Sequence, residues 1–441
     1  MSSIDFTRRD FVKLSLASAF GVSYSGWLPR LAQAAEEAGS KHKAVILLWM
    51  TGGPTQTDTF DLKMGHPNGG PSKAIETAVS GIQISEHLPG VAKQMKDLAI
   101  IRSLTTAEGD HDRATRLMLT GHRPGQEGVN YPSLGSLFAK ELGDESSDLP
   151  PYVSVSPFRF GDAGGPGFLG PNYAPLVVSG DSRDPEARAN LSIENLKAPP
   201  GVSKESMEKR FEISKFLQDD FANRAKGPST KAHKANFDRA MRMIATNAKG
   251  AFKLDEETAA LRDKYGRSQF GQGCLLARRL VERGAAFVEV TLQGWDTHGD
   301  TFNAVKGLCA TLDPAWSTLM TDLRERGLLE STLIVWMGEF GRTPKINNNA
   351  GRDHFPLAWS TVLGGGGVKG GQVIGSTGDA GTEVKDRPVK IADLYATMCA
   401  SIGVNPENEN ISPEGRPIPL ADRSGKIIEE IAARPAKKQK T

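Results

Sequence analysis

Three short segments in the C-terminal half of the chain carry residue types that could bind a metal ion. They read GWDTHGD at residues 294–300, GEFGRTP at 338–344 and GRDHFP at 351–356. The first two directly follow apolar runs typical of strands. Zinc, manganese and iron all accept mixed nitrogen and oxygen ligands from acidic and imidazole side chains. The segments offer five such side chains: Asp296, His298, Glu339, Asp353 and His354.

The apolar runs before the first two segments predict the elements that position these side chains. Residues 286–292 (AFVEVTL) and 333–337 (LIVWM) each end close to a candidate loop. Between them, Asp313 and Pro314 are typical of an N-cap and first residue, and they predict a helix that ends at Gly327. A strand, helix, strand order favours a parallel sheet with right-handed crossovers. Both loops should then lie beyond the carboxyl ends of strands, where such sheets bind ligands.

Further strands and helices are predicted along the rest of the chain. Apolar runs predict strands at 44–50, 98–104, 152–155, 175–178 and 358–363, and helices are expected at 112–120 and 391–402. From about 185 to 284 the charge density rises. Within this stretch apolar residues recur at helical spacing, which predicts a helical insertion; they are Phe211, Ile213, Phe216, Leu217 and Phe221. The expected fold class is α/β, with a mainly parallel sheet flanked by helices.

The N-terminus has the pattern of a twin-arginine signal peptide at residues 1–34. Two consecutive arginines, Arg8 and Arg9, precede a weakly apolar run, and Ala32-Gln33-Ala34 matches a small-residue cleavage site. The alternative is a basic amphipathic first helix. The signal predicts export by the twin-arginine translocation machinery to the periplasm or the extracellular space. The α/β domain is then expected at 35–424, followed by a basic tail at 425–441.

Composition excludes some partners and sites. The 441 residues carry a formal net charge of +2, which gives no case for nucleic acid as a partner. The three cysteines, Cys274, Cys309 and Cys399, are far apart and odd in number. They indicate neither a disulfide framework nor a sulfur-ligated metal site, so buried free thiols are expected.

Three motifs together carry a resemblance to a known family. They are GGPTQTDTFD at residues 52–61, GWDTH at 294–298 and GEFGRTP at 338–344. With the order of the strands, they resemble the alkaline phosphatase-like superfamily, which includes phosphatases, sulfatases and phosphodiesterases. More closely, the chain resembles the exported proteins grouped as domain of unknown function 1501. This closer resemblance covers nearly the whole mature chain, from Lys43 to Leu394.

The resemblance implies a ligand set for a first metal ion and an incomplete second site. Asp296, His298 and His354 match the order of the superfamily's first-site ligands. At the second site, Glu339 can replace an aspartate, but Phe340 stands where the superfamily has a histidine. That site also uses an aspartate directly after the first strand. Here Thr51-Gly52-Gly53 follows that strand, and the nearest candidate ligand is Asp58.

The candidate catalytic residues are His111, Thr51 and Arg342. His111 stands at the position of the formylglycine-forming cysteine of sulfatases, so the formylglycine route is excluded. Its imidazole could act as nucleophile, as general acid or base, or as another metal ligand. A hydroxyl from Thr51 or Thr55 could replace it as nucleophile. Arg342, with Arg352, could bind an oxyanion through bidentate hydrogen bonds, or both could be solvated charges.

The resemblance and the motifs together lead to an exported, metal-dependent hydrolase of phosphate or sulfate esters. The expected cofactor is a divalent metal, zinc first, with manganese, iron or calcium as alternatives. The expected substrate is a small-molecule or polysaccharide ester. The competing hypothesis is a non-catalytic surface or carbohydrate-binding protein that retains the fold, and a third is a structural partner in an envelope assembly. In the structural alternative, Asp296 and His298 are ordinary loop residues and Glu339 pairs with Arg342.

Overall fold

The computed structural model describes residues 42–432 apart from several internal gaps. The gaps are residues 145–146, 158–163, 180–188, 190, 192–202, 226, 228–229, 231–233, 235–236 and 239–246. The predicted signal peptide, its cleavage site and most of the basic tail therefore lie outside the described residues.

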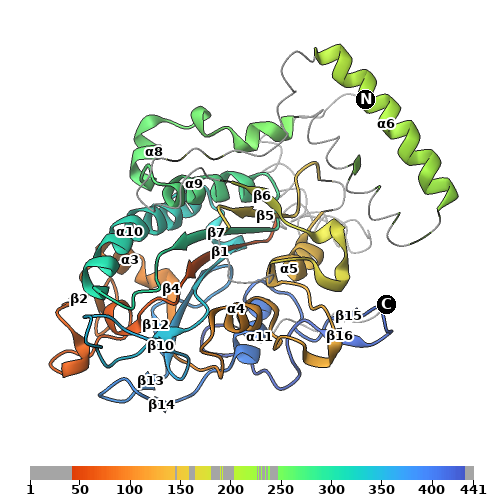
Figure 1. The fold of residues 1–441 in the computed structure, drawn as a ribbon. Helices are drawn as coiled ribbons and strands as arrows, with labels where there is room; N and C mark the ends of the chain where they lie inside the picture. Colours follow the sequence, from red (N-terminus) through yellow and green to blue (C-terminus); the bar gives the residue numbers. More distant parts are fainter. Residues whose placement is uncertain are drawn as a thin grey trace, which may run out of the picture. The chain divides into compact units, whose positions relative to one another are not determined.

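A large sheet forms the centre of the fold (Figure 1). Its eight strands lie in the order β12, β4, β11, β8, β1, β7, β5 and β6. Their bounds in that order are Gln372–Ile374, Leu98–Leu104, Trp359–Gly365, Thr332–Met337, Ala44–Thr51, Phe287–Gln293, Tyr152–Val155 and Leu176–Val178. All pairings are parallel except those of β11, which runs antiparallel to β4 and β8. The predicted mainly parallel α/β fold is confirmed, and each predicted strand belongs to this sheet.

Alternation along the central strand β1 explains why its sequence is continuously apolar. Ile46, Leu48 and Met50 pack into one layer of the core, whereas Val45, Leu47 and Trp49 pack into the other. Successive side chains of a strand point to opposite faces, and helices cover both faces here, so each position is buried. Full burial of side chains of this size contributes roughly 1.5–3 kcal/mol each to folding.

Two groups of helices cover the sheet (Figure 1). The first core layer includes side chains from α3 (Pro89–Lys93), α9 (Gln269–Glu282) and α10 (Thr301–Glu325). The second includes side chains from α4 (His111–Thr120), α5 (Leu134–Leu142) and α11 (Ile391–Ser401). The predicted helices at 112–120 and 391–402 are thus confirmed, and Gly121 ends the first in a left-handed conformation.

The predicted start of a helix at Asp313 was wrong. Helix α10 begins at Thr301 and continues through Pro314. The carboxylate of Asp313 instead accepts hydrogen bonds from the backbone N–H groups of Gly90 at 2.9 Å and Val91 at 2.8 Å. Amides in the first turn of a helix have no acceptor within the helix, and Asp313 supplies one for α3. Asp313 therefore caps a neighbouring helix. A capping residue type was recognised correctly, but its partner lies over 200 residues away in the sequence.

The remaining elements are peripheral to the central sheet. Helix α6 (Lys204–Arg224) lies within the region predicted to be a helical insertion, and Ile213, Phe216, Leu217 and Phe221 on it are exposed. Helix α8 (Ala259–Tyr265) packs against α9 and α10. The short strand pairs are β2 (Ala74–Glu76) with β3 (Gln83–Ser85), β9 (Gly341–Arg342) with β10 (His354–Phe355), β13 (Ser376–Thr377) with β14 (Val384–Asp386), and β15 (Glu409–Ile411) with β16 (Pro417–Pro419).

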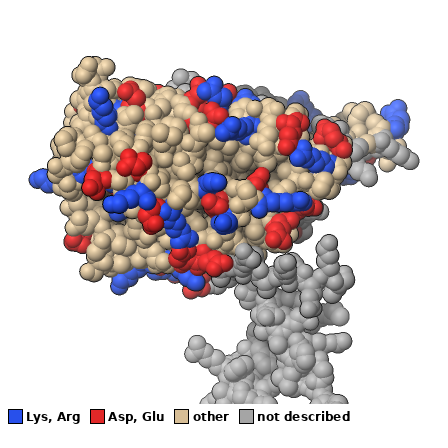
Figure 2. All heavy atoms as spheres, turned by 90° about the horizontal axis from the view of Figure 1, so that it is seen from below, with Lys and Arg blue, Asp and Glu red and all other residues tan. Residues whose placement is uncertain are grey.

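The state of the cysteines and the distribution of surface charge agree with what the composition predicts. Cys274, Cys309 and Cys399 are buried and free, as predicted. On the face in Figure 2, the described basic and acidic side chains are interspersed. Among the helices that the structure describes, none has both the length and the apolar character needed to cross a bilayer.

Candidate metal centre

Three adjacent strands end at the same edge of the sheet and bring two of the predicted segments together. Strand β1 lies between β7 and β8, with Thr51 opposite Gln293 and Trp49 opposite Met337. Because these strands are parallel, the segments that follow them leave the sheet side by side. Asp296 follows β7 and Glu339 follows β8, so both lie at the edge where the sequence predicted them.

Gly52, directly after β1, allows the loops to approach closely. Its φ of +114° is unfavourable for residues with a side chain, and an added Cβ would lie 2.3 Å from the backbone nitrogen of Asp296. The N–H of Gly52 donates a hydrogen bond of 2.8 Å to Oε1 of Glu339. A glycine at this position therefore lets the β1 backbone touch both neighbouring loops at once.

The third predicted segment packs onto the first. The backbone N–H of Arg352 donates to the carbonyl of Thr297 at 3.0 Å. A Cβ at Gly351 would lie only 2.0 Å from the carbonyl oxygen of His298, so this approach too requires glycine. Strand β10 then pairs antiparallel with β9, with His354 opposite Arg342. These contacts carry His354 to the edge of the sheet that already holds Asp296.

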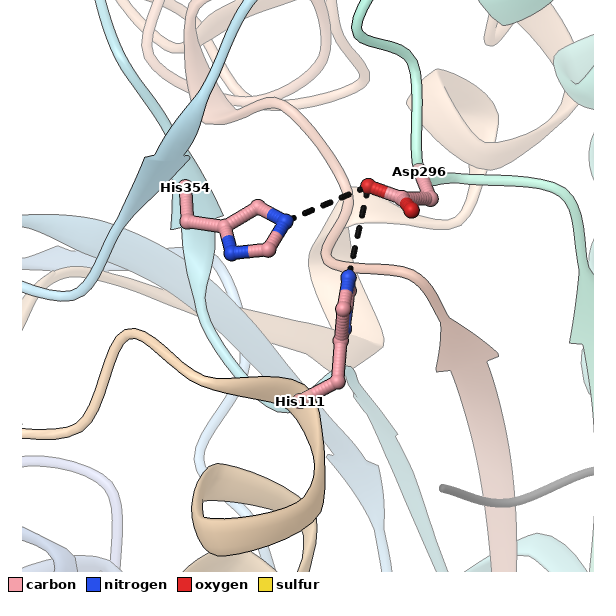
Figure 3. Close-up of side chains that lie close together, drawn as sticks. All are labelled: His111, Asp296 and His354. Atoms are coloured by element: carbon pink, nitrogen blue, oxygen red, sulfur yellow. Dashed lines mark hydrogen bonds and ion pairs between the residues drawn. The ribbon is translucent and has the colours of Figure 1, made fainter.

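Imidazole groups from separate segments converge on one carboxylate oxygen of Asp296 (Figure 3). Nε2 of His111, at the first residue of α4, and Nε2 of His354 each lie 3.3 Å from Oδ1 of Asp296. Ligand atoms of these three residues all lie within 4.8 Å of one another. Nε2 of His298 joins them at 3.1 Å from Oδ1 and 3.0 Å from Nε2 of His354.

The other ring nitrogen of each histidine contacts a hydrogen-bond acceptor. Nδ1 of His111 lies 2.7 Å from Oε1 of Glu339, Nδ1 of His298 lies 2.9 Å from Oδ1 of Asp353, and Nδ1 of His354 lies 2.7 Å from the carbonyl oxygen of Gly109. A carbonyl or an ionised carboxylate can only accept a hydrogen bond, so each Nδ1 carries a hydrogen and donates the hydrogen bond. In a neutral ring this leaves the lone pair on Nε2, which faces Asp296.

This arrangement needs a shared cation. The guanidinium of Arg342 offsets part of the repulsion, because it donates to Oδ1 of Asp296 and to Nε2 of His298. The Nε2 lone pairs of His111 and His354 and the carboxylate oxygen would still repel one another at these separations unless a proton or a metal ion lay between them. Burial lowers the pKa of His111, but hydrogen bonds and charge from Asp296 and Glu339 outweigh it and raise the pKa to about 9. Burial acts to raise the pKa of Asp296, and hydrogen bonds from His111, His354 and Arg342 hold it well below its usual range.

Arg342 donates a hydrogen bond to the same oxygen of Asp296 that the imidazoles face. Its guanidinium is fully buried. It donates from Nε to the carbonyl of Gly53 at 3.1 Å, from Nη1 to the carbonyl of Arg352 at 3.2 Å and to Nε2 of His298 at 3.4 Å, and from Nη2 to the carbonyl of Gly52 and to Oδ1 of Asp296. A guanidinium has five N–H donors, and these contacts use them all. The structure therefore places the predicted oxyanion ligand Arg342 as a buried support for Asp296.

Asp58 and Thr51, two further candidates, have other surroundings. Asp58 is fully buried, and Arg352 donates to its two carboxylate oxygens from Nε at 2.7 Å and from Nη2 at 3.2 Å. Thr55 donates a third hydrogen bond to Asp58 at 2.8 Å. Thr51 is buried at the end of β1. Asp58 does not belong to the group of His111, Asp296 and His354.

Phe340 occupies the region beside the histidines. Its ring centroid lies 4.8 Å from that of His111 and 4.7 Å from that of His354, and the side chain is buried. An apolar ring thus stands where the resemblance implied a histidine ligand for a second metal ion. Glu339 is also buried, and its carboxylate contacts Nδ1 of His111.

Sequence reasoning missed two parts of this arrangement. The carbonyl of Gly109 carries no signal in the sequence, because every residue has such a group. Asp353 was recognised as a possible ligand, but its position as the acceptor for His298 depends on the docking of two loops. The sequence left nucleophile, general acid or base, and metal ligand open for His111, and its position beside Asp296 and His354 is compatible with metal binding.

Comparison with known proteins gives one family match. The family model described as "Protein of unknown function (DUF1501)" matches residues 42–432. No curated protein matches the sequence.

Several solved structures are similar to the chain. A sulfatase from Pseudoalteromonas sp. is 14% identical with a TM-score of 0.41, covering 86% of this chain and 70% of that chain. An alkaline phosphatase superfamily protein from Vibrio parahaemolyticus is 13% identical with a TM-score of 0.39, covering 83% and 67%. A phosphonate monoester hydrolase from Silicibacter pomeroyi is 12% identical with a TM-score of 0.36, covering 83% and 74%. These distant likenesses carry no argument about activity.

Proposed function

We propose that this chain, which belongs to the DUF1501 family of proteins of unknown function, is an exported metal-dependent hydrolase of phosphate or sulfate esters. The ester class rests on the resemblance of its motifs to the alkaline phosphatase-like superfamily. Metal dependence rests on the site itself. A small-molecule or polysaccharide ester is the proposed substrate.

One observation carries the metal assignment: three Nε2 atoms converge on Oδ1 of Asp296 while each Nδ1 is held by an acceptor. Metal-binding histidines in proteins commonly donate their second ring N–H to a carboxylate or a carbonyl, which fixes the tautomer and the ring plane. The proposed ligands are therefore His111, Asp296, His298 and His354. Asp58 is left out because Arg352 engages both its oxygens.

The ligand chemistry favours zinc. Three imidazoles and one carboxylate suit zinc, and manganese or iron could take the same set. Calcium prefers six to eight oxygen ligands and fits this set poorly. Zinc is the first metal to test.

The chain's own residues would prepare the site for hydrolysis. A divalent cation there would supply Lewis-acid polarisation of the ester. Asp296 stays ionised and is held in place by Arg342. Glu339 and Asp353 keep protons at Nδ1 of His111 and His298, which leaves the lone pair of each ring on Nε2. Because His111 has both ring nitrogens engaged, we assign it to binding and water to the attack on the ester.

A specific observation favours the alternative, a non-catalytic surface or carbohydrate-binding protein. Arg342 contacts the same carboxylate oxygen that the histidines face, and Phe340 fills the region beside them. Competition between the Arg342 guanidinium and a metal ion for Asp296 would weaken metal binding. If protons alone neutralise the imidazoles, the cluster is a structural element.

Export by the twin-arginine pathway is the proposed route to the periplasm or the extracellular space. The consecutive arginines, the apolar run and the cleavage pattern at residues 1–34 support it. This pathway exports folded proteins, which suits a chain that takes up its metal in the cytoplasm. Substitution of Arg8 and Arg9 by lysine should keep the protein in the cytoplasm, measured by cell fractionation.

Metal content and turnover together test the proposed activity. The purified mature protein, loaded with zinc and dialysed, should hold about one metal ion per chain by elemental analysis. It should also hydrolyse at least one of an aryl phosphate, an aryl phosphodiester and an aryl sulfate. His354→Ala and Asp296→Ala should lower both metal content and turnover.

A histidine outside the three loops provides the matched control. His87→Ala should retain metal and turnover. If the wild-type protein binds zinc but hydrolyses none of the three ester classes, the alternative, non-catalytic function is favoured. If His354→Ala and Asp296→Ala leave both metal content and turnover unchanged, the proposed site is wrong.

A further inference from the structure

We propose that Glu339 is a positioning residue, which fixes the tautomer and orientation of His111 and so sets the metal affinity of the site, instead of binding a second metal ion. This inference rests on the metal binding proposed above. It assigns a role to a carboxylate that the sequence presented as a ligand or a base.

The hydrogen bonds of Glu339 carry the inference. Its Oε1 lies 2.7 Å from Nδ1 of His111 and also accepts the backbone N–H of Gly52 at 2.8 Å. Its side chain is fully buried. One oxygen thus joins the end of β1, the end of β8 and the start of α4. A carboxylate held on two sides in this way cannot turn toward another partner without breaking both contacts.

The geometry of His111 shows what this contact does. Its Nδ1 faces Glu339, and its Nε2 faces Asp296 at 3.3 Å. An ionised carboxylate at Nδ1 favours a proton there and raises the basicity of Nε2, the atom that would bind the metal. The ring lies between two carboxylates, and a rotation about Cβ–Cγ would lose both contacts.

The surroundings argue against a second metal at Glu339. Oε2 is buried and has no hydrogen-bond partner among the described residues, so it is the oxygen that a second ion would have to use. A second ion there would need further ligands, but the adjacent residue is Phe340, whose ring packs against His111. The described residues form one candidate metal group, that of His111, Asp296 and His354.

Cobalt binding gives a direct readout besides activity. The metal-free mature protein is titrated with Co²⁺, and affinity is measured from the visible absorption. In the loaded wild-type protein, each histidine that binds through Nε2 and carries a proton on Nδ1 should give one exchangeable, hyperfine-shifted proton NMR signal. The signal of His111 should exchange slowly with D₂O, because only 12% of its side chain is exposed, against 48% for His298.

The variant Glu339→Gln removes the charge and keeps the size of the side chain. It should weaken Co²⁺ binding about 10–100-fold. The His111 signal should either disappear or exchange faster with D₂O. Glu339→Ala should weaken binding further. Glu289→Gln is the matched control: Glu289 is buried in strand β7, where it accepts a 2.9 Å hydrogen bond from Tyr152. The control should keep wild-type affinity even if it is less stable.

Several results would overturn the inference. Equal Co²⁺ affinity in wild type and Glu339→Gln would show that the contact does not set the affinity. Two bound ions in the wild type and one in Glu339→Gln would make Glu339 a ligand. If the variant does not fold, absence of a slowly exchanging His111 signal in the wild type decides against the inference. A wild-type protein that binds no Co²⁺ or Zn²⁺ would instead overturn the proposed function.

Discussion

Oδ1 of Asp296 is in contact with three imidazoles and one guanidinium. His298 comes from the same loop, whereas His111, Arg342 and His354 come from segments distant in the sequence. So many potential cations around one oxygen keep Asp296 ionised, and the same negative charge favours any cation that enters. Arg342 is the one member of this group that cannot lose its charge. It also donates buried hydrogen bonds to the carbonyls of Gly52 and Gly53, so its role is to support the loop after β1.

Arg342→Lys tests this structural role at the residue scale. Lysine keeps the charge but has fewer donors in a different geometry, so buried carbonyls lose their hydrogen bonds. We expect the free energy of unfolding, measured in urea, to fall by about 2–4 kcal/mol. Arg113→Lys is the control, since Arg113 also contacts a carboxylate but is 57% exposed, and it should change stability far less than Arg342→Lys does. Equal effects of the two variants would contradict the buried role.

At the scale of elements, the site depends on how closely the loops after β1 and β7 approach each other. Gly52 allows this approach, and its amide also holds Glu339. The strand register itself comes from apolar packing on both faces of the sheet and does not involve the site. Loop contact and strand pairing can therefore be separated by substitution.

Gly52→Ala should disrupt the site more than backbone strain alone would. The positive φ costs about 1–2 kcal/mol for alanine, and the Cβ would also lie 2.3 Å from the nitrogen of Asp296. We expect a loss of more than about 3 kcal/mol in unfolding free energy, together with loss of zinc binding. Gly81→Ala is the control, because Gly81 has a φ of +81° with no atom within 4 Å of its Cβ. Zinc binding retained in Gly52→Ala would show that close approach is unnecessary.

For the whole molecule, stability should depend on pH partly through a histidine that is not a proposed metal ligand. The ring of His122 stacks on Tyr131 with centroids 3.6 Å apart. Burial lowers the pKa of His122, and Asp422 and Glu127 oppose this shift while Arg416 adds to it. The folded chain therefore favours the neutral ring, whereas the unfolded chain takes up a proton near pH 6.5.

The stability contributed by neutral His122 should be complete above about pH 6.5 and lost as the pH falls through the lower pKa of the folded state. His122→Gln cannot take up this proton. We expect the melting temperature of the wild type to fall more steeply between pH 7.5 and 5 than that of His122→Gln, measured by thermal unfolding of the metal-free proteins. If the melting temperatures of the two proteins fall equally with pH across this range, His122 does not contribute.

The sequence by itself determined seven of the eight strands of the sheet, all but β12, and two of the segments at its edge. Runs such as residues 44–50 are apolar at every position, and only a strand covered on both faces buries them all. Since parallel strands end at a common edge, Asp296 and Glu339 could be placed together before any coordinates were known. The ligand types followed from the residues alone.

Only the tertiary structure decided how these groups divide their roles. The contact between His111 and Glu339 spans 228 residues, and that between Asp58 and Arg352 spans 294. Such pairings depend on the packing of loops and on which ring nitrogen meets an acceptor, and neither leaves a periodic pattern in the chain. The length of α10 was misjudged for the same reason, since Asp313 caps a helix that is remote in sequence. Local patterns specify local elements, whereas a site is built from contacts between them.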